Sequence, residues 1–350
     1  MHTLLYPMTN VEMQVIETCY FFIKGNKFME EFKYLIPEES IDAIMSNVST
    51  LREIENELRK TFVENQYLEV LMPSFEYVDL YNEMDIGIEE EKMFQYINYE
   101  GKRVALRTDF TVPLARLYST QEEHGEKRYC YFGKVYRKEK RHKGRSSEFF
   151  QAGIELIGKD EKDGDKECLE LVLKTLPLLK LKDIKIELGS AKFYKRICEM
   201  VDDNRFIDIL KKRDISAMNA FVQEKQFSSS FKQLLMKLPR CFGDMTVLEE
   251  VIPFITDTKL KESILELQDL HNQLGNPKEM VFDLAMAPSM KYYTGIMMKG
   301  YSPYSADAIM HGGRYDLLLS HFKQDAPAIG FSYDLSHILK AIEKEGEAHD

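Results

Sequence analysis

Apolar residues between Ile44 and Phe62 recur at steps of three and four, which places them on one stripe of a helix. The positions on this stripe are Ile44, Val48, Leu51, Ile54, Leu58 and Phe62. The pattern stops near Asn65, so we predict one amphipathic helix that ends there. The short apolar run at residues 68–72 is closed by Pro73, which favours a strand.

Alternating segments with turn residues between them predict antiparallel strand pairs. Residues 93–98 and 103–107 flank a turn in which Gly101 can take the positive φ that a tight turn requires. Residues 128–138 and 148–157 form a second pair, joined by a charged connection. We therefore expect the main sheet to be largely antiparallel.

Between about residues 184 and 280, the apolar residues follow the spacing of helices and strand patterns are rare. Strand patterns return in three segments, at residues 281–285, 292–299 and 328–333. A last helix follows, with Leu335, Ile338, Leu339 and Ile342 on one side.

These elements predict an α+β fold in which a mostly antiparallel sheet is flanked by helices. We assign residues 29–183 and 281–350 to this core and residues 184–280 to a helical insertion. Residues 1–28 match no later pattern and are expected to be an extension.

Composition narrows the class of protein. With 44% hydrophobic and 30% charged residues, the chain is typical of a folded protein. A formal charge of −11 argues against a surface that coats nucleic acid. No apolar stretch is long enough for a membrane span and the start lacks an export signal, so we expect a cytoplasmic protein. Five cysteines without a C-x-x-C pair and eight histidines without metal spacing predict no metal site.

The predicted strand at residues 148–157 has two different faces. One face is apolar and is expected to join the core, with Phe150, Ala152, Ile154 and Leu156. The other face brings a ring, an amide and a carboxylate around a small residue, with Phe149, Gln151, Gly153 and Glu155. This set suits a small polar ligand that carries a cationic group. A solvated sheet face would explain the same alternation.

Two further segments could bind charged ligands, although each also has an ordinary structural explanation. Asp109 and Thr111 offer a carboxylate and a hydroxyl beside a helix start at Pro113, where such residues also serve as caps. Residues 138–145 bring five basic side chains together directly after Arg137. Such a run suits a phosphate-bearing ligand or forms a solvated hairpin tip.

In this order, the segments resemble the core of class II aminoacyl-tRNA synthetases, and that of histidyl-tRNA synthetase in particular. The resemblance covers about residues 34–339. The first helix with the strand before Pro73 is similar to motif 1, residues 128–158 to motif 2 and residues 328–339 to motif 3. Tyr-Tyr-Thr-Gly at 292–295 and Gly-Gly-Arg-Tyr-Asp at 312–316 resemble the histidine-recognition signatures of that enzyme.

The resemblance implies a histidine-binding site of seven residues, namely Asp109, Thr111, Arg137, Gln151, Glu155, Tyr292 and Tyr293. Asp109, which stands where the family usually has Glu, would hold the α-amino group together with Thr111 and Gln151. Glu155 and the two tyrosines would fix the imidazole, and Arg137 would contact the carboxylate. A vestigial nucleotide site would comprise Phe149, Arg141 and Arg314, with Phe149 where the family stacks a ring on adenine.

Two arginines that the synthetases use for adenylation are replaced. Pro288 stands at the first arginine of the Arg-Gly-Leu-Asp-Tyr-Tyr signature, and His337 stands at the motif 3 arginine. Groups that stabilise charge at a phosphoryl transition state are each worth several kcal/mol, so we expect adenylation to be lost. Leu339 lies 11 residues before the end of the sequence, which leaves no room for an anticodon-binding domain.

This combination is similar to the regulatory subunits of ATP phosphoribosyltransferase, which belong to the first step of histidine biosynthesis. The resemblance implies a non-catalytic, allosteric role without a cofactor. It implies as partners the short-form catalytic subunit, L-histidine as feedback inhibitor, and a second copy of the chain in a homodimer within a hetero-octamer. No membrane or tRNA partner is expected.

Two alternatives follow from the same residues. The first is an active enzyme, a truncated histidyl-tRNA synthetase or another ATP-dependent carboxylate-activating protein, in which Lys291 or Arg314 supplies the missing charge. The second is a tRNA-binding module without chemistry, whose affinity for tRNA would depend strongly on salt.

Overall fold

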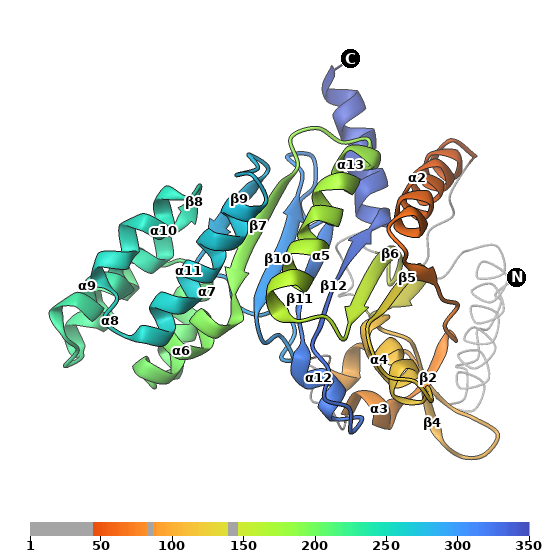
Figure 1. Ribbon diagram of the computed structural model, residues 1–350, viewed down its shortest axis with the longest axis horizontal. Helices are drawn as coiled ribbons and strands as arrows, with labels where there is room; N and C mark the ends of the chain where they lie inside the picture. The colour runs from red at the N-terminus through yellow and green to blue at the C-terminus, as the bar shows by residue number, and fades with distance from the viewer. Residues whose placement is uncertain (1–44, 83–86, 88, 139–145, 350) are drawn as a thin grey trace, which may run out of the picture.

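The computed structural model describes residues 45–82, 87, 89–138 and 146–349. Its centre is a nine-stranded sheet with the order β1-β5-β6-β12-β11-β10-β7-β9-β8 (Figure 1). The strands in this order are β1 (Leu68–Glu69), β5 (Lys127–Tyr136), β6 (Glu148–Ile157), β12 (Ala328–Asp334), β11 (Met310–Arg314), β10 (Ile296–Tyr301), β7 (Lys185–Ser190), β9 (Met280–Asp283) and β8 (Phe242–Gly243).

Neighbouring strands of this sheet are antiparallel, apart from the parallel pairs β1–β5 and β7–β9. The prediction of a mostly antiparallel sheet is therefore confirmed. The predicted pairing of residues 128–138 with 148–157 is confirmed as the β5–β6 hairpin, in which Tyr129 lies opposite Glu155 and Tyr131 opposite Gly153.

Three helices cover one face of the sheet: α2 (Met45–Glu64), α5 (Glu161–Thr175) and α13 (Leu335–His349). The apolar stripe of α2 forms as predicted, because Ile54, Leu58 and Phe62 are fully buried in the main core. Ile154 and Leu156 of β6 reach the same core from the sheet. The structure thus confirms the apolar face of the 148–157 strand.

The opposite face of the sheet is covered by α4 (Thr111–Ser119) and α12 (Asp316–Ser320), with α3 (Val78–Asn82) close by (Figure 1). A small sheet lies beside them, with the order β2 (Phe75–Tyr77), β4 (Arg103–Leu106) and β3 (Gln95–Ile97). Gly101 has a φ of 76° in the β3–β4 turn, and its N–H donates to the carbonyl of Asn98. The predicted hairpin is confirmed.

The α-helices between residues 184 and 280, the range that the sequence assigned to a helical insertion, are α6 (Ala191–Val201), α7 (Asn204–Lys211), α8 (Ile215–Glu224), α9 (Ser229–Lys237), α10 (Thr246–Val251) and α11 (Thr258–Gln273). Short 3-10 helices complete the chain: η1 (Glu90–Lys92), η2 (Leu176–Leu179), η3 (Leu238–Arg240) and η4 (Ile252–Phe254). Side chains before five of these α-helices accept a hydrogen bond from the first turn, namely those of Ser190, Asp203, Asp214, Ser228 and Asp257. These caps explain where the helices begin.

The expectation that helical structure starts at residue 184 is wrong. Residues 185–190 form β7, which pairs with β10 on one side and β9 on the other. Two further strand boundaries are corrected, because β10 begins at Ile296 rather than at residue 292 and β1 spans only two residues. Short strands are specified by partners far away in the sequence, which local alternation does not reveal.

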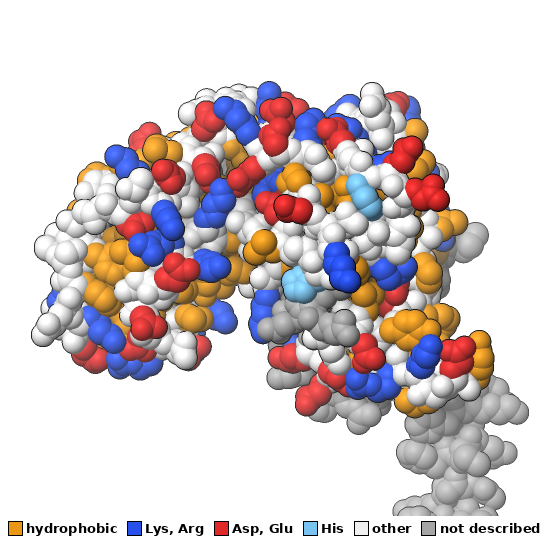
Figure 2. Space-filling view, turned by 60° about the horizontal axis from the view of Figure 1, so that its bottom comes forward, with side chains coloured by type: hydrophobic (Ala, Val, Ile, Leu, Met, Phe, Trp, Pro, Cys, Tyr) orange, Lys and Arg blue, Asp and Glu red, His pale blue; other side chains and the backbone are white. Residues whose placement is uncertain are grey.

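The face drawn in Figure 2 has a hollow between the helical insertion and the rest of the molecule. Basic and acidic side chains are mixed across the described part of this face. None of the described helices combines the length and the apolar character that crossing a bilayer requires. The expected extension, residues 1–28, and most of the basic run, residues 139–145, lie outside the described residues.

Candidate functional site

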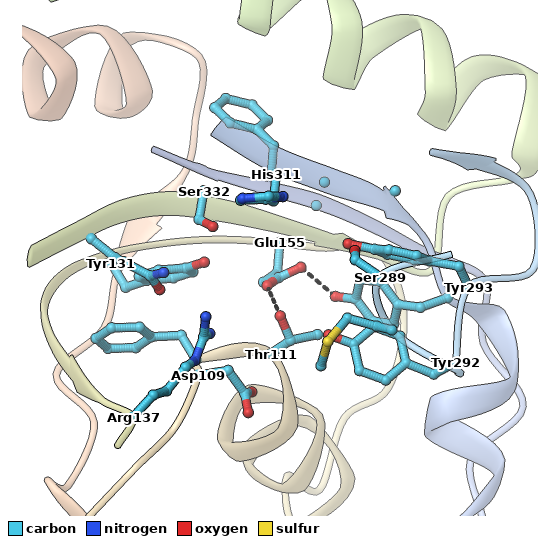
Figure 3. Close-up of a pocket in the computed structure, with 18 residues that line it drawn as sticks. Asp109, Thr111, Tyr131, Arg137, Glu155, Ser289, Tyr292, Tyr293, His311 and Ser332 are labelled. Carbon is cyan, nitrogen blue, oxygen red and sulfur yellow. Dashed lines mark hydrogen bonds between the residues drawn. The ribbon is translucent and has the colours of Figure 1, made fainter. Parts of the chain in front are cut away.

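A cavity of about 200 Å³ lies on the face of the sheet that carries α4 and α12. The structure brings to it all seven residues of the predicted histidine site: Asp109, Thr111, Arg137, Gln151, Glu155, Tyr292 and Tyr293. In Figure 3, Glu155 lies between Thr111 and His311, with Tyr292 and Tyr293 on one side and Tyr131 and Arg137 on the other. The volume is below the range of about 300–1,000 Å³ that is usual for drug-sized ligands, so it suits a smaller molecule.

Glu155 is the most deeply placed acid of the cavity, with 2% of its surface exposed. Its Oε2 accepts a hydrogen bond of 2.5 Å from the Tyr315 hydroxyl, and its Oε1 accepts one of 2.7 Å from the Thr111 hydroxyl (Figure 3). Burial raises the pKa of the Glu155 carboxyl to about 8, although both hydroxyl donors lower it. The carboxyl therefore changes its charge near neutral pH.

Space for this carboxyl comes from glycine on the adjacent strand. A Cβ atom at Gly330 would lie 1.8 Å from the Glu155 Oε2 and 2.5 Å from the Ile154 carbonyl oxygen. A Cβ atom at Gly153 would lie 2.5 Å from the Tyr131 hydroxyl. Gly153, which the sequence placed between Gln151 and Glu155, therefore leaves room for the Tyr131 hydroxyl. Gly330 leaves room for the Glu155 carboxyl.

Asp109 lies at the start of α4, with 5% of its surface exposed. Its Oδ1 accepts a hydrogen bond of 2.8 Å from the backbone N–H of Val112, and its Oδ2 accepts one of 3.1 Å from the Thr108 hydroxyl. Burial raises the pKa of this carboxyl, while the Val112 N–H and the nearby Arg137 guanidinium lower it. Asp109 therefore accepts a hydrogen bond from the first turn of α4 and also lines the cavity.

Arg137 follows the last residue of β5 and is half-buried. Its Nε donates a hydrogen bond of 2.8 Å to the carbonyl of Thr108. This bond holds the guanidinium beside the start of α4, where it lines the cavity. The two terminal nitrogens of a guanidinium can bind a carboxylate in a bidentate manner.

Tyr292 and Tyr293 lie in the loop before β10, not in a strand. Their ring centroids are 5.3 Å apart with an interplanar angle of 80°, and the Tyr292 ring meets the Tyr315 ring at 5.8 Å. Burial raises the pKa of Tyr293 above its usual value. The phenols therefore stay protonated and can donate or accept hydrogen bonds.

Of the three residues of the predicted nucleotide site, the two that the structure describes, Phe149 and Arg314, do not line this cavity. Arg141 lies outside the described residues. The Phe149 ring meets the edge of the His337 ring, with centroids 5.9 Å apart. Arg314 is fully buried and forms ion pairs with Asp165 at 2.7 Å and Asp316 at 2.9 Å.

The placement of Arg314 corrects two expectations. Its guanidinium belongs to an ion-pair network beneath α5, so Arg314 neither joins a nucleotide site nor supplies charge to the cavity. Lys291, the other candidate for the missing charge, is exposed and does not line the cavity. The guanidinium of Arg314 is thus already paired with two carboxylates of the fold.

Several lining residues were given no role by the sequence, namely Tyr131, Ser289, His311, Tyr315 and Ser332. Tyr131 and Ser332 lie opposite Gly153 in the neighbouring strands, so only the strand pairing could have indicated them. Burial and the nearby Lys299 and Arg137 lower the pKa of His311 to about 4, so its ring is neutral at pH 7. Among the described residues, no cluster of three or more His, Cys, Asp or Glu side chains could hold a metal ion.

The chain resembles known proteins over most of its length. The family model of histidyl-tRNA synthetase matches residues 41–338. An ATP phosphoribosyltransferase regulatory subunit of Lactococcus lactis subsp. lactis (strain IL1403) is 42% identical over 322 residues, which cover 91% of this chain and 98% of that one. The chain belongs to the family of ATP phosphoribosyltransferase regulatory subunits.

A second member of this regulatory-subunit family, from Bacillus cereus (strain ATCC 10987 / NRS 248), is 31% identical over 332 residues, 92% of this chain and 79% of that one. The structure titled ATP phosphoribosyltransferase regulatory subunit/histidyl-tRNA synthetase from Bacillus halodurans C has a TM-score of 0.80 at 26% identity and covers 88% of this chain and 83% of that one. Histidyl-tRNA synthetase from Nostoc sp. PCC 7120 shares the fold, with a TM-score of 0.72 at 18% identity over 89% and 76% of the two chains.

These likenesses confirm the class II synthetase fold that the sequence motifs predicted. They also confirm the regulatory-subunit family, whose name describes a regulatory chain and not the catalytic one. The role of this member of the family is therefore regulatory and non-catalytic, which disfavours the active-enzyme alternative.

Proposed function

We propose that this regulatory subunit binds L-histidine in the cavity around Glu155 and reports its presence to the catalytic subunit of ATP phosphoribosyltransferase. The observation that carries the proposal is the chemistry of one small cavity. Carboxylates, an amide, a guanidinium and phenols converge there, which are the groups that an amino acid with an imidazole side chain needs. Each part of the ligand has a complementary group.

The polar groups divide naturally between the two ends of histidine. Asp109 and Gln151 would hold the α-amino group, and Arg137 would bind the α-carboxylate. Glu155 would accept a hydrogen bond from the imidazole, with Tyr292 and Tyr293 beside the ring. Thr111 would act differently from the sequence-based expectation, because its hydroxyl donates to Glu155 and so orients that carboxyl rather than the amino group.

The groups around the nucleotide position support a role without adenylation. Pro288 and His337 occupy the two positions where the resemblance implies arginine. The His337 ring packs edge-on against Phe149, and its Nδ1 lies 3.5 Å from the Asp334 Oδ2.

Regulation would follow from a difference in affinity. Histidine can shift the complex only by as much as it binds one quaternary state better than another, typically about 1–3 kcal/mol. In our proposal the chain activates the short-form catalytic subunit and histidine reverses this activation. We further propose a cytoplasmic complex in which a homodimer of this chain is part of a hetero-octamer.

Calorimetry tests whether the cavity binds histidine. We expect saturable binding with one site per chain, and a loss of affinity of at least about tenfold in Gln151→Ala, because the amide contact with the amino group is removed. Gln223→Ala, on the exposed face of α8, is the matched control and should bind as the wild type does. An absence of binding in the wild type would refute the histidine site.

A second assay separates this proposal from the enzyme alternative. Histidine-dependent pyrophosphate exchange should stay at the level of the Gln151→Ala variant, because Pro288 and His337 hold the positions of the two lost arginines and Arg137 is the one guanidinium on the described wall of the cavity. Exchange clearly above that level would mean that the chain activates histidine.

A further inference from the structure

The Glu155 carboxyl has no cationic partner in the part of the chain that the structure describes. Among the described residues, no ion pair includes Glu155, although it is almost fully buried and aimed into the cavity. Its two hydrogen bonds come from the uncharged hydroxyls of Tyr315 and Thr111. A carboxylate offers about four acceptor positions, so about two remain for a ligand. A buried, ionised carboxylate is stable only when it is paired, and here the partner must come with the ligand.

The ionisable groups that face Glu155 do not supply this partner. From the start of α4 comes Asp109, a second carboxyl, and from β11 comes His311, which is neutral at pH 7. The phenols of Tyr131, Tyr292, Tyr293 and Tyr315 carry no positive charge in either form. The Cys168 thiol, buried on α5 beneath the sheet, carries none either.

Arg137 is the one guanidinium on the described wall of the cavity, and its Nε is already bonded to the Thr108 carbonyl. In the proposed binding mode, Arg137 is neutralised by the α-carboxylate of histidine, and Asp109 by the α-amino group. Glu155 is then the carboxyl that remains to bind the imidazole ring of histidine. A neutral ring would face either the protonated Glu155 carboxyl or an unpaired buried carboxylate, whereas a protonated ring would pair with the carboxylate.

We propose that the cavity binds histidine with its ring protonated, as an imidazolium paired with Glu155. An imidazolium donates from both ring nitrogens, and the acceptors it needs are the Glu155 carboxylate and the phenol oxygens beside it. The site would thus select its ligand by the basicity of the ring as well as by its shape. This inference rests on the proposed function, because it assumes that histidine is the ligand.

The source of the proton on the ring depends on the pH. In the empty site, Glu155 holds a proton below about pH 8, and the free ring is neutral above about pH 6.5. Between these values, binding moves the proton from the Glu155 oxygen to the ring nitrogen, and no proton enters or leaves. Above about pH 8 the empty carboxyl is already ionised, so binding must take up about one proton from solution.

Two measurements on the full chain test the inference. Calorimetry in buffers of different ionisation enthalpy should show that the wild type takes up about one proton more than Glu155→Gln at pH 9, because uptake by the α-amino group of histidine is common to both, and that the two proteins differ little at pH 7.5. Nitrogen NMR of ring-labelled histidine should show both ring nitrogens protonated in the complex at pH 8, where the free ring is neutral. Glu155→Gln should bind at least about tenfold more weakly, without the additional proton uptake that the wild type shows at pH 9.

Tyr315→Phe is the matched variant, because it disturbs the same corner of the cavity and keeps the Glu155 carboxyl. It should retain the proton uptake at pH 9 even if its affinity falls. A bound ring that stays neutral in the wild type would overturn the imidazolium proposal and leave histidine binding intact. No binding of histidine at all would overturn both.

Discussion

Glu155 is held by two hydroxyl donors at a depth where ionisation is unfavourable. Its pKa rises from 4.5 to about 8, so the folded chain holds a proton that the unfolded chain releases between these values. The free energy of unfolding of the empty protein therefore falls as the pH rises through this window. A bound cation would remove this loss.

The substitution Glu155→Gln tests this argument. Because the amide cannot ionise, the variant should not lose stability between pH 5 and pH 9 through this position, whereas the wild type should. At pH 9 the empty variant should be more stable than the empty wild type by up to about 4 kcal/mol, and at pH 5 the two should be similar. Urea unfolding at both pH values measures the difference. Parallel pH profiles of the two proteins would contradict the assigned pKa.

The substitution Gly330→Ala tests whether the close approach of β12 to the Glu155 carboxyl is needed. An added methyl group would lie 1.8 Å from the Glu155 Oε2, so Gly330→Ala should displace the carboxyl. We expect a loss of about 1–3 kcal/mol in stability and of at least about tenfold in histidine affinity. Gly125→Ala is the control, because nothing lies within 4 Å of a Cβ atom at that position. Equal behaviour of both variants in calorimetry and urea unfolding would refute the role of Gly330.

For single residues, the sequence predicted many of the side chains that line the cavity but not the contacts that surround them. Alternation placed Gln151 and Glu155 on one face of a strand, and that face is the cavity wall rather than a solvated surface. Tyr315 and Arg314 stood in one motif, yet one side chain bonds Glu155 and the other pairs with Asp165. Adjacent residues of an extended segment point to opposite faces, so a motif alone could not tell which of them binds.

Among the elements, α5 is joined to the sheet by a buried ion-pair network. Arg314 at the end of β11 pairs with Asp165 of α5 and with Asp316 of α12, and it also donates to backbone carbonyls before α5. Burial raises the pKa of Asp165 to about 7 despite this pairing. The network therefore depends on all of its members.

Arg314→Met should be strongly destabilising, because it leaves the Asp165 carboxyl buried without its partner. We expect a loss of about 3–5 kcal/mol in the free energy of unfolding, measured by urea titration. The exposed pair Lys162–Asp269 at 3.6 Å provides the comparison, since Lys162→Met should change stability by less than about 1 kcal/mol. A similarly small effect of both substitutions would show that Arg314 does not stabilise the fold.

Some helices and strands are determined by residues close together in the sequence, and others by residues far apart. The stripe of α2 and the β3–β4 turn at Gly101 follow from residues close together, and both were predicted. The strand β7 has only six residues, Lys-Ile-Glu-Leu-Gly-Ser, and its partners β9 and β10 lie about a hundred residues farther along. Its strand conformation depends on these distant pairs, which is why the helical expectation failed there.

For the whole molecule, the two faces of the sheet have separate tasks. One face packs on α2, α5 and α13 and stabilises the fold, and the other holds the cavity beneath α4 and α12. The solved structures of a regulatory subunit/histidyl-tRNA synthetase and of a histidyl-tRNA synthetase share this fold. In our proposal, the cavity has kept the groups that recognise histidine, while the positions for adenylation hold Pro288 and His337.

The rate of phosphoribosyl transfer to ATP by the short-form catalytic subunit is the most direct measurement, with this chain added and histidine varied. We predict that the wild-type chain raises the rate, that histidine lowers it again, and that Gln151→Ala still activates but responds only at about tenfold higher histidine. A rate that does not change when this chain is added would contradict histidine sensing through this cavity. So would the same response to histidine in the wild type and in Gln151→Ala.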